Sequence, residues 1–245
     1  MKDAATMKAE LKKLIDTAAG RIPADLVIKN CKVVNVFSGK IQEGDIAFSG
    51  DQIAGIGEYE GKEVIDAEGR YAAPGFIDSH LHLESTLVTP AELVTAASRH
   101  GTTTFIVDPH ESANVSGLAG IDYILDQTED VKANVYVMMP SCVPATAIDD
   151  NGCTLTAEDM VPYLHNSRIL GLGEVMDSIS VVQGEKSMHD KLELFEGRIR
   201  DGHAPFLEEG DLQAYAMAGI ATDHECSFFD YAMRERRNGL TILVR

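Results

Sequence analysis

The sequence predicts an α/β fold in which a barrel of alternating strands and helices follows a small β domain. After residue 74, apolar runs alternate with helix-like segments at about 25 to 40 residues per unit, a rhythm typical of parallel β/α units. Between residues 24 and 72 the chain instead shows short β-branched runs separated by Gly, Asn, Asp and Ser. We therefore expect a helix within 1–22, a β domain at 23–73 and a barrel-type domain at 74–245.

Each element follows from its local pattern. Apolar residues recur at helical spacing from Met7 to Ala18, with charged residues between them and Gly20 after them, which predicts one surface helix. The β-domain runs are ADLVIKNCKVVNVFSG, GDIAFSGDQIAGIG and KEVIDAEGRYAAP. The expected barrel strands are 75–82, 102–108, 134–140, 169–175, 198–203, 219–224 and 240–244, and the expected helices are 90–99, 117–127, 156–164, 188–196, 210–218 and 227–238. Such a fold is an incomplete (β/α)8-type TIM barrel, one β/α unit short.

Composition excludes several classes of function. Lys and Arg total 21 against 39 Asp and Glu, so the net charge of −18 argues against a nucleic-acid or anionic-membrane partner. No apolar stretch approaches the roughly 20 residues of a membrane-spanning helix, and the first residues lack a signal-peptide core, so we expect a cytoplasmic protein. Its four cysteines form no C-x-x-C pair, which disfavours a disulfide framework or a zinc knuckle.

Ligand-type side chains follow the expected strands at the point where each strand ends. Side chains at i and i+2 of a strand point to the same side, so His80 and His82 can reach one metal ion. The carboxyl ends of barrel strands share one face, so residues far apart in the sequence converge there. The residues at these ends are His80 and His82, then Asp108 with His110 and Glu111, then Glu174, then His203, then His224 with Glu225.

Helix capping and metal binding compete as explanations. Asp108 and Glu111 suit helix capping as well as they suit a metal site. Helix caps alone would not require four histidines at strand ends together with Glu174. These five residues also exceed the three protein ligands that a single catalytic ion uses. Two divalent ions that share Glu174 fit this set better. Histidine and carboxylate ligands without thiolate suit Zn(II), Mn(II) or Fe(II), and the ligands alone do not choose among them.

The segment PGFIDSHLH at 74–82, after a β domain and before strand-end histidines, resembles the amidohydrolase superfamily of metal-dependent barrel hydrolases. The H-x-H motif specifies only the superfamily, whereas D-P-H-E, S-C-V-P-A and the strand-end Glu174 resemble the adenine deaminases within it. The matching phrases are SHLHLES at 79–85, GTTTFIVDPHE at 101–111, SCVPA at 141–145, GLGEVM at 171–176, DGHAP at 201–205 and AGIATDHE at 218–225. The resemblance covers residues 24–245.

This resemblance implies a binuclear site. His80 and His82 would bind the first ion, His203 and His224 the second, and Glu174 would bridge the two. The implied ions are Mn(II) or Fe(II), with Zn(II) as an alternative. The implied reaction is the hydrolytic deamination of adenine to hypoxanthine and ammonia by a metal-bound hydroxide, a step of purine salvage and adenine catabolism.

Further residues receive roles from the same resemblance. Glu84, taken to share the strand face of His80 and His82, is expected to contact the purine or to move a proton, and a capping role explains it equally well. A further set of residues is expected to form a second polar shell around the ions or an accessory metal site: Asp108, His110, Glu111 and Glu225. The substrate is a small molecule, adenine, and a homo-oligomer is left open.

Other interpretations stay open. One is a different ring hydrolase of the superfamily, imidazolonepropionase-like or dihydroorotase-like, although Glu174 in place of the usual lysine counts against the latter. Another is a non-catalytic remnant of the fold. The other deaminase design combines H-x-E with P-C-x-x-C, and this sequence lacks its P-C-x-x-C half, because Cys142 lies in P-S-C-V-P without a second thiol at that spacing. In the family an Asp at the end of the eighth strand completes the site and distant strands complete a β-sandwich, so we expect an N-terminal fragment that is inactive alone.

Overall fold

The structure is a computed structural model that describes residues 4–146 and 148–244. Its contacts divide the chain into one unit that ends at Pro74 and another that begins at Gly75. Each unit has its own hydrophobic core. Among the described residues, no helix combines the length and the apolar character needed to cross a membrane. Residues 1–3 of the expected N-terminal helix lie outside the described residues.

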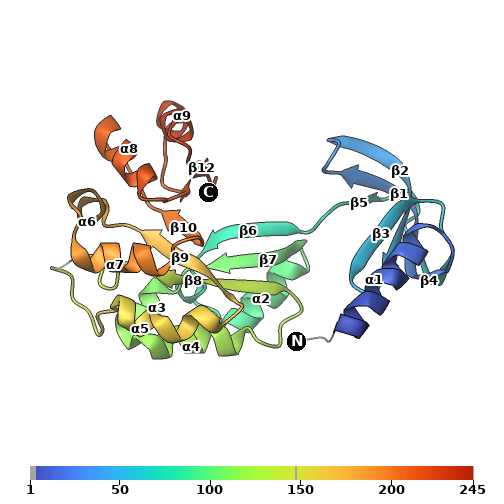
Figure 1. Cartoon of the computed structure of the whole chain (residues 1–245), viewed down its shortest axis with the longest axis horizontal. Coiled ribbons are helices and arrows are strands. Elements are labelled where there is room, and N and C mark those ends of the chain that lie inside the picture. The colour runs from blue at the N-terminus through green and yellow to red at the C-terminus, as the bar shows by residue number, and fades with distance from the viewer. Residues whose placement is uncertain (1–3, 147, 245) are drawn as a thin grey trace. The chain divides into compact units, whose positions relative to one another are not determined.

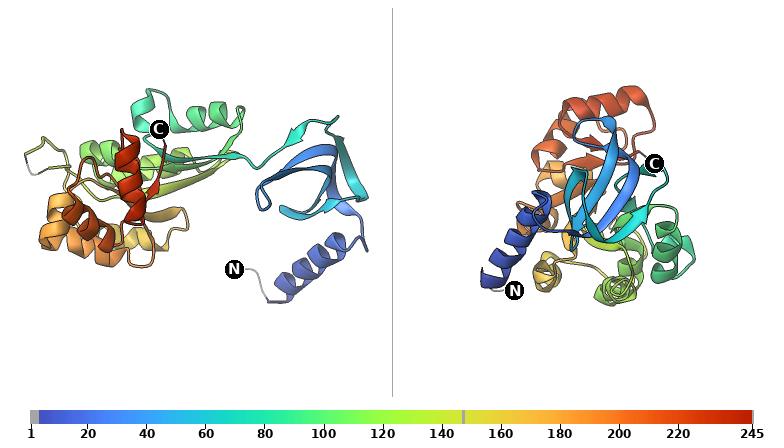
Figure 2. Two further views of the ribbon diagram at one scale, coloured as in Figure 1. Left: turned by 90° about the horizontal axis from the view of Figure 1, so that it is seen from above. Right: turned by 90° about the vertical axis from the view of Figure 1, so that its right-hand side faces the viewer.

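The first unit contains one helix and one mixed sheet. Strand β1 lies between the antiparallel β2 and the parallel β4, β3 pairs with β2, and β5 adds to β1. Figure 2 shows α1 beside this sheet. The elements are α1 (Ala4–Ala18), β1 (Ala24–Asn35), β2 (Lys40–Ser49), β3 (Gln52–Gly57), β4 (Gly61–Asp66) and β5 (Tyr71–Ala72). Up to residue 74 the described part of the chain forms a single sheet, so the expected sandwich is not established.

An ion-pair cluster joins the helix to this sheet. The carboxylate of Asp25 lies 2.6 Å from Lys13 of α1 and 2.8 Å from Lys62 of β4, and it also accepts a hydrogen bond from the Gly50 backbone N–H. The two ammonium groups and this N–H hold the pKa of Asp25 well below its usual range. Since these groups are solvent-exposed, their contribution is to fix position more than to add stability.

The second unit is built on a parallel sheet with the order β10-β9-β8-β7-β6. Figure 1 shows α3, α4 and α5 on one side of this sheet. The strands are β6 (Phe76–Leu81), β7 (Thr102–Val107), β8 (Asn134–Pro140), β9 (Ile169–Val175), β10 (Ile199–Gly202), β11 (Thr222–Asp223) and β12 (Thr241–Ile242). The helices are η1 (Glu84–Thr86), α2 (Pro90–Ser98), α3 (His110–Ser116), α4 (Leu118–Gln127), α5 (Ala157–Met160), η2 (Val161–His165), α6 (Ser178–Gln183), α7 (Lys186–Leu194), α8 (Glu209–Met217) and α9 (Phe229–Arg237).

The central strands are buried because the sheet is covered by apolar side chains. Val137, Met139 and Leu172 have no exposed surface, and Phe105 is 2% exposed. Burying one such side chain contributes about 1.5–3 kcal/mol, so this core, rather than helix propensity, determines the fold. The curled parallel sheet of five strands fits an incomplete TIM barrel, as the sequence predicts.

Two arginines donate hydrogen bonds to backbone carbonyls near the amino ends of β8 and β9. The guanidinium of Arg168 donates to the carbonyls of Leu125 and Val135, and that of Arg198 donates to the carbonyls of Leu164 and Ile169. Multiple donors in a planar fork suit several carbonyls at once. The end of the sheet opposite the expected ligand face is thereby closed by charge-assisted hydrogen bonds.

The last two expected strands differ from the expectation. The structure shortens both, and β11 and β12 pair with each other in a separate two-stranded sheet. A hydrogen bond of 3.0 Å from Ala221 N to the Arg200 carbonyl still keeps β11 beside β10. Helices η1, α3 and α6 are not among those expected from the sequence, because α3 (HESANVS) is largely polar and because η1 and α6 are only three and six residues long.

The close approach of β9 and β10 leads to a stability prediction. A Cβ at Gly171 would lie 2.0 Å from the Ile199 carbonyl oxygen, so we expect Gly171→Ala to force the two strands apart and to cost about 1–3 kcal/mol in the free energy of unfolding. Chemical denaturation measures the change. The matched control is Gly210→Ala, where a Cβ meets open space in the first turn of α8 and should be neutral or slightly stabilising. Equal stability of both variants would contradict the prediction.

Candidate metal centre

His80 lies in β6 and His82 just past its end, and the two rings face each other edge-on. Their Nε2 atoms are 3.1 Å apart. The Nδ1 atom of His80 is 2.9 Å from a carboxylate oxygen of Asp201, and Nδ1 of His82 is 2.8 Å from the Asp108 carbonyl oxygen. Since both partners accept only, each Nδ1 carries the proton and donates it. In the neutral rings, both Nε2 atoms therefore present lone pairs.

Two facing lone pairs are the arrangement that a metal ion requires. At 3.1 Å the Nε2 atoms repel each other unless a proton or a cation lies between or beside them. Histidines that ligate metals commonly donate their second ring N–H to a carboxylate or a backbone carbonyl, as His80 and His82 do here. The residues present thus fit a divalent cation.

Glu174, at the end of β9, is the hub of the cluster. It is 4% exposed, and one of its oxygens lies 2.8 Å from Nδ1 of His203 and 3.0 Å from Nε2 of His224. The other oxygen lies 2.9 Å from Nδ1 of His110 and 3.7 Å from Nε2 of His82. Burial would raise the pKa of Glu174, but the hydrogen bonds from His203 and His224 and the nearby His110 ring hold it far below its usual range. The carboxylate therefore stays ionised.

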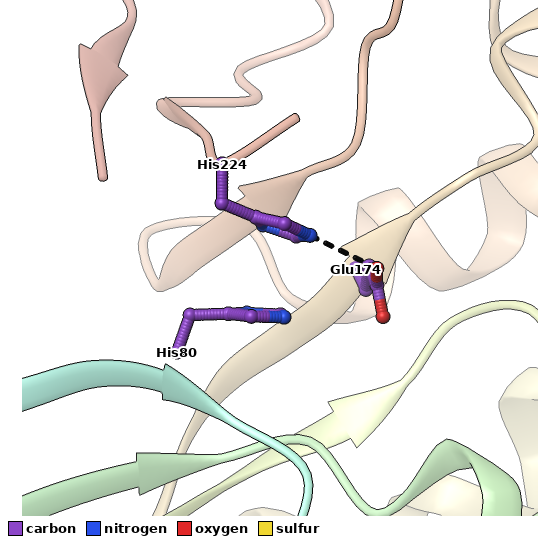
Figure 3. Close-up of side chains that lie close together, drawn as sticks. All are labelled: His80, Glu174 and His224. Carbon is purple, nitrogen blue, oxygen red and sulfur yellow. Dashed lines mark hydrogen bonds and ion pairs between the residues drawn. The ribbon is translucent and has the colours of Figure 1, made fainter. Parts of the chain in front are cut away.

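The rings of His80 and His224 stack, with centroids 3.6 Å apart and planes 20° from parallel. Figure 3 shows the two rings one above the other, with their edges directed toward Glu174. Ligand atoms lie within 4.8 Å of one another in three groups at this end of the sheet. These groups are His80, Glu174 and His224; His82, His110 and Glu174; and His203, His224 and Glu225.

His110, which was expected only in a second polar shell or an accessory site, lies in direct contact with Glu174. It begins α3 and lies 2.9 Å from Glu174 and 3.6 Å from the carboxylate of Asp108. Although burial alone would lower it, these two carboxylates raise the pKa of His110 to about 11. The position favours a positive charge, which a bound cation would supply in place of the ring proton.

Asp108 lies beside this position without a hydrogen-bond donor of its own. Its side chain is buried, burial raises its pKa, and neither carboxylate oxygen has a hydrogen-bond partner among the described residues. A Cβ at Gly173 would lie 2.2 Å from this carboxylate, so the glycine makes room for it. Such an unsatisfied buried oxygen is a further observation that fits a cation.

Glu84 does not share the strand face of the histidines, so that expectation is wrong. Strand β6 ends at Leu81, and Glu84 lies in η1. One carboxylate oxygen accepts hydrogen bonds of 3.2 Å from the N–H groups of Glu111 and Ser112, which caps α3. The other oxygen is buried and has no partner among the described residues. The capping interpretation thus explains the contacts of one Glu84 carboxylate oxygen and leaves the other oxygen unexplained.

The remaining expected residues lie at the margin. The exposed Glu111 carboxylate accepts a hydrogen bond from the Ser85 hydroxyl. A carboxylate oxygen of Glu225 lies 3.9 Å from Nε2 of His224. Both are near the cluster, but only Glu225 falls within one of its three ligand groups.

Asp201 and Lys191 support the cluster through hydrogen bonds but were not predicted from the sequence. Asp201, 4% exposed, accepts from His80 and from the Thr222 hydroxyl, and the motif D-G-H at 201–203, with an acid two residues before a strand-end histidine, is the signal that could have revealed it. Lys191 donates to the Ser141 carbonyl at 2.6 Å, and the Ser141 hydroxyl donates to the Glu174 carbonyl at 2.9 Å. No local signal in the sequence predicts that second chain of contacts.

Comparison with known proteins gives consistent results. Residues 71–241 match the Amidohydrolase family. An adenine deaminase of Desulfitobacterium hafniense (strain Y51) is 56% identical over 236 residues, covering 96% of this chain and 42% of that protein. An adenine deaminase of Clostridium acetobutylicum is 47% identical over 237 residues, with coverages of 96% and 42%. The chain thus spans less than half the length of these relatives.

Solved structures agree at the level of the fold. An N-acyl-D-glutamate deacylase from Bordetella bronchiseptica, complexed with zinc and a phosphonate inhibitor, has a TM-score of 0.57 and 18% identity, covering 91% of this chain and 58% of that one. An uncharacterized metal-dependent hydrolase from Pyrococcus horikoshii OT3 has a TM-score of 0.58 and 11% identity, with coverages of 89% and 74%. At these identities the likeness shows the fold alone.

Proposed function

The chain belongs to the amidohydrolase family, and from that membership we propose that it is part of an adenine deaminase, which hydrolyses adenine to hypoxanthine and ammonia. The observation that carries the proposal is the cluster around Glu174, where histidines from several strand ends meet one ionised carboxylate. The identity of 56% to an adenine deaminase over nearly the whole chain supports the choice of substrate.

The family and the three ligand groups support a divalent metal cofactor. We propose two ions, with Glu174 between them, because Glu174 belongs to two of the groups. By distance, His80 and His224 share one group and His82 and His110 another, which differs from the pairing that the family resemblance implies and adds His110 as a proposed ligand. Mn(II) or Fe(II) is the proposed metal, with Zn(II) as the alternative.

Different residues of the chain have different proposed roles in the reaction. Bound divalent ions supply a nucleophile from water near neutral pH and stabilise developing negative charge. Glu174 holds the negative charge that keeps cations and protonated rings in place. The buried Glu84 oxygen that has no described partner is proposed to contact the purine and to hold or move a proton at the ring nitrogen or the leaving amine.

Other parts of the proposal concern the setting. The β unit before Pro74 is proposed to belong to a larger β-sandwich. A small molecule, adenine, is the proposed partner, and a homo-oligomer stays open. The four cysteines, all free in the structure, support a reducing compartment such as the cytoplasm.

The direct test is turnover. The natural gene product, loaded with Mn(II) or Fe(II), is expected to release ammonia from adenine and to form hypoxanthine, measured by absorbance and by an ammonia assay. Adenosine, dihydroorotate and imidazolonepropionate are the comparison substrates, and they should react far more slowly. Opening of dihydroorotate or imidazolonepropionate without adenine turnover would overturn the assignment in favour of another ring hydrolase.

A further inference from the structure

A second cluster of ligand-type side chains, with no histidine among them, is formed by residues of β11, of α9 and of the segment between them. It consists of Asp223, Cys226 and Glu235, whose ligand atoms lie within 4.8 Å of one another. Asp223 and Glu235 have no exposed surface, and Cys226 is half-buried. Although Asp223 precedes His224 in the sequence, this cluster shares no residue with the three histidine-containing groups.

Asp223 accepts hydrogen bonds from three backbone N–H groups. One of its oxygens accepts a hydrogen bond of 2.6 Å from the Ala204 N–H, and the other accepts from the N–H groups of Glu225 and Cys226 at 2.9 and 3.0 Å. Three backbone donors thus fix both Asp223 oxygens in place within the cluster.

Glu235 adds a second carboxyl group that lacks a donor. Both of its oxygens are buried, and neither has a hydrogen-bond partner among the described residues. The adjacent Tyr231 hydroxyl gives its proton to the Ala204 carbonyl and accepts from the Leu207 N–H. Within the described chain, no lysine or arginine forms an ion pair with Asp223 or Glu235, and the guanidinium of Arg234 donates to the Leu207 carbonyl. Two buried carboxyl groups and a thiol thus face one another without a cationic side chain.

Burial and the Asp223 carboxylate together raise the pKa of Glu235 to about 8, so the cluster favours an added positive charge. A proton shared between Asp223 and Glu235 would supply one positive charge. It would link only those two carboxyl groups, whereas a metal ion can contact the ligand atoms of Asp223, Cys226 and Glu235 at once. We propose that Asp223, Cys226 and Glu235 bind a divalent cation, with zinc as the best match.

Zinc is favoured by the mixture of sulfur and oxygen donors. A thiolate disfavours Mg²⁺ and Ca²⁺, which bind oxygen, and zinc accepts Cys and Asp or Glu ligands in a tetrahedral arrangement. Three side chains leave one position, which water can reach because Cys226 is partly exposed. The ion would tie α9 to the end of β11, next to His224, and it stands independently of the reaction proposed above.

Cobalt(II) distinguishes this site from the histidine cluster, because only Cys226 among the described candidate ligands supplies a thiolate. We expect the full chain, titrated with Co(II), to develop a near-ultraviolet thiolate-to-cobalt charge-transfer absorption. Cys226→Ser should abolish it and should remove one equivalent of bound Zn(II). The matched control Cys153→Ser, at a half-buried thiol outside all the ligand groups, should keep both signals.

A second variant guards against a folding defect in the first. Glu235→Gln retains the thiol, so the band should persist but require about tenfold more cobalt or higher to saturate. Circular dichroism verifies that each variant is folded. The absence of a thiolate band in the parent chain at saturating cobalt, or an unchanged band in folded Cys226→Ser, would overturn the proposal and leave a proton-sharing carboxyl pair.

Discussion

Replacing Glu174 by Gln is expected to lower the affinity of the histidine cluster for divalent metal by more than about 100-fold. The carboxylate lies against His110, His203 and His224 at 2.8–3.0 Å, so the amide would remove the charge that those rings face and would present N–H donors to them. Loss of a residue that merely supports a ligand already costs about 10–100-fold, and Glu174 is placed to contact the ions directly.

Metal content after dialysis and calorimetric titration measure this effect. The matched control is Glu193→Gln on the exposed surface of α7, which should bind as much Mn(II) or Zn(II) as the parent chain. Thiolate-dependent cobalt binding at Cys226 should also survive in Glu174→Gln, because the two clusters share no residue. Two equivalents retained at unchanged affinity in Glu174→Gln would contradict the central role of this carboxylate.

The fold was largely predictable because its signals are local. Apolar runs such as 134–140 and 169–175 coincide with β8 and β9, since strands that are buried on both faces need continuous apolar side chains. The pair His80 and His82 could be placed from the two-residue period of a strand. The match to the Amidohydrolase family confirms the resemblance that these motifs carry.

The errors have identifiable causes. The two-residue period of His80 and His82 extends to Glu84 in the sequence, whereas β6 stops at Leu81 and the chain turns into η1. Helix α3 was missed because it is polar, and its position depends on the Glu84 carboxylate that caps it from 27 residues away in the sequence. The approach of His110 to Glu174 follows from that helix, so a local reading of the sequence could not supply it.

Asp201 shows the same limitation, and it gives the second prediction of large effect. Its carboxylate accepts from Nδ1 of His80 at 2.9 Å, and the Thr222 hydroxyl fixes its other oxygen. In Asp201→Asn the amide can place its NH₂ group against His80, which favours the tautomer with the proton on Nε2. That tautomer cannot bind metal. We therefore expect the affinity for divalent metal to fall by about 10–100-fold.

A double-mutant cycle separates this orienting effect from simple loss of charge. If Asp201 acts through His80, Asp201→Asn should weaken metal binding strongly in the parent chain and very little in a His80→Ala background. The control Asp211→Asn makes the same chemical change at an exposed position of α8, and it should leave the affinity unchanged in both backgrounds. Equal losses from Asp201→Asn with and without His80 would show that the carboxylate acts on the cluster through its charge alone. The ring contact would then be incidental, and the assignment of a lone pair to His80 Nε2 would lose its support.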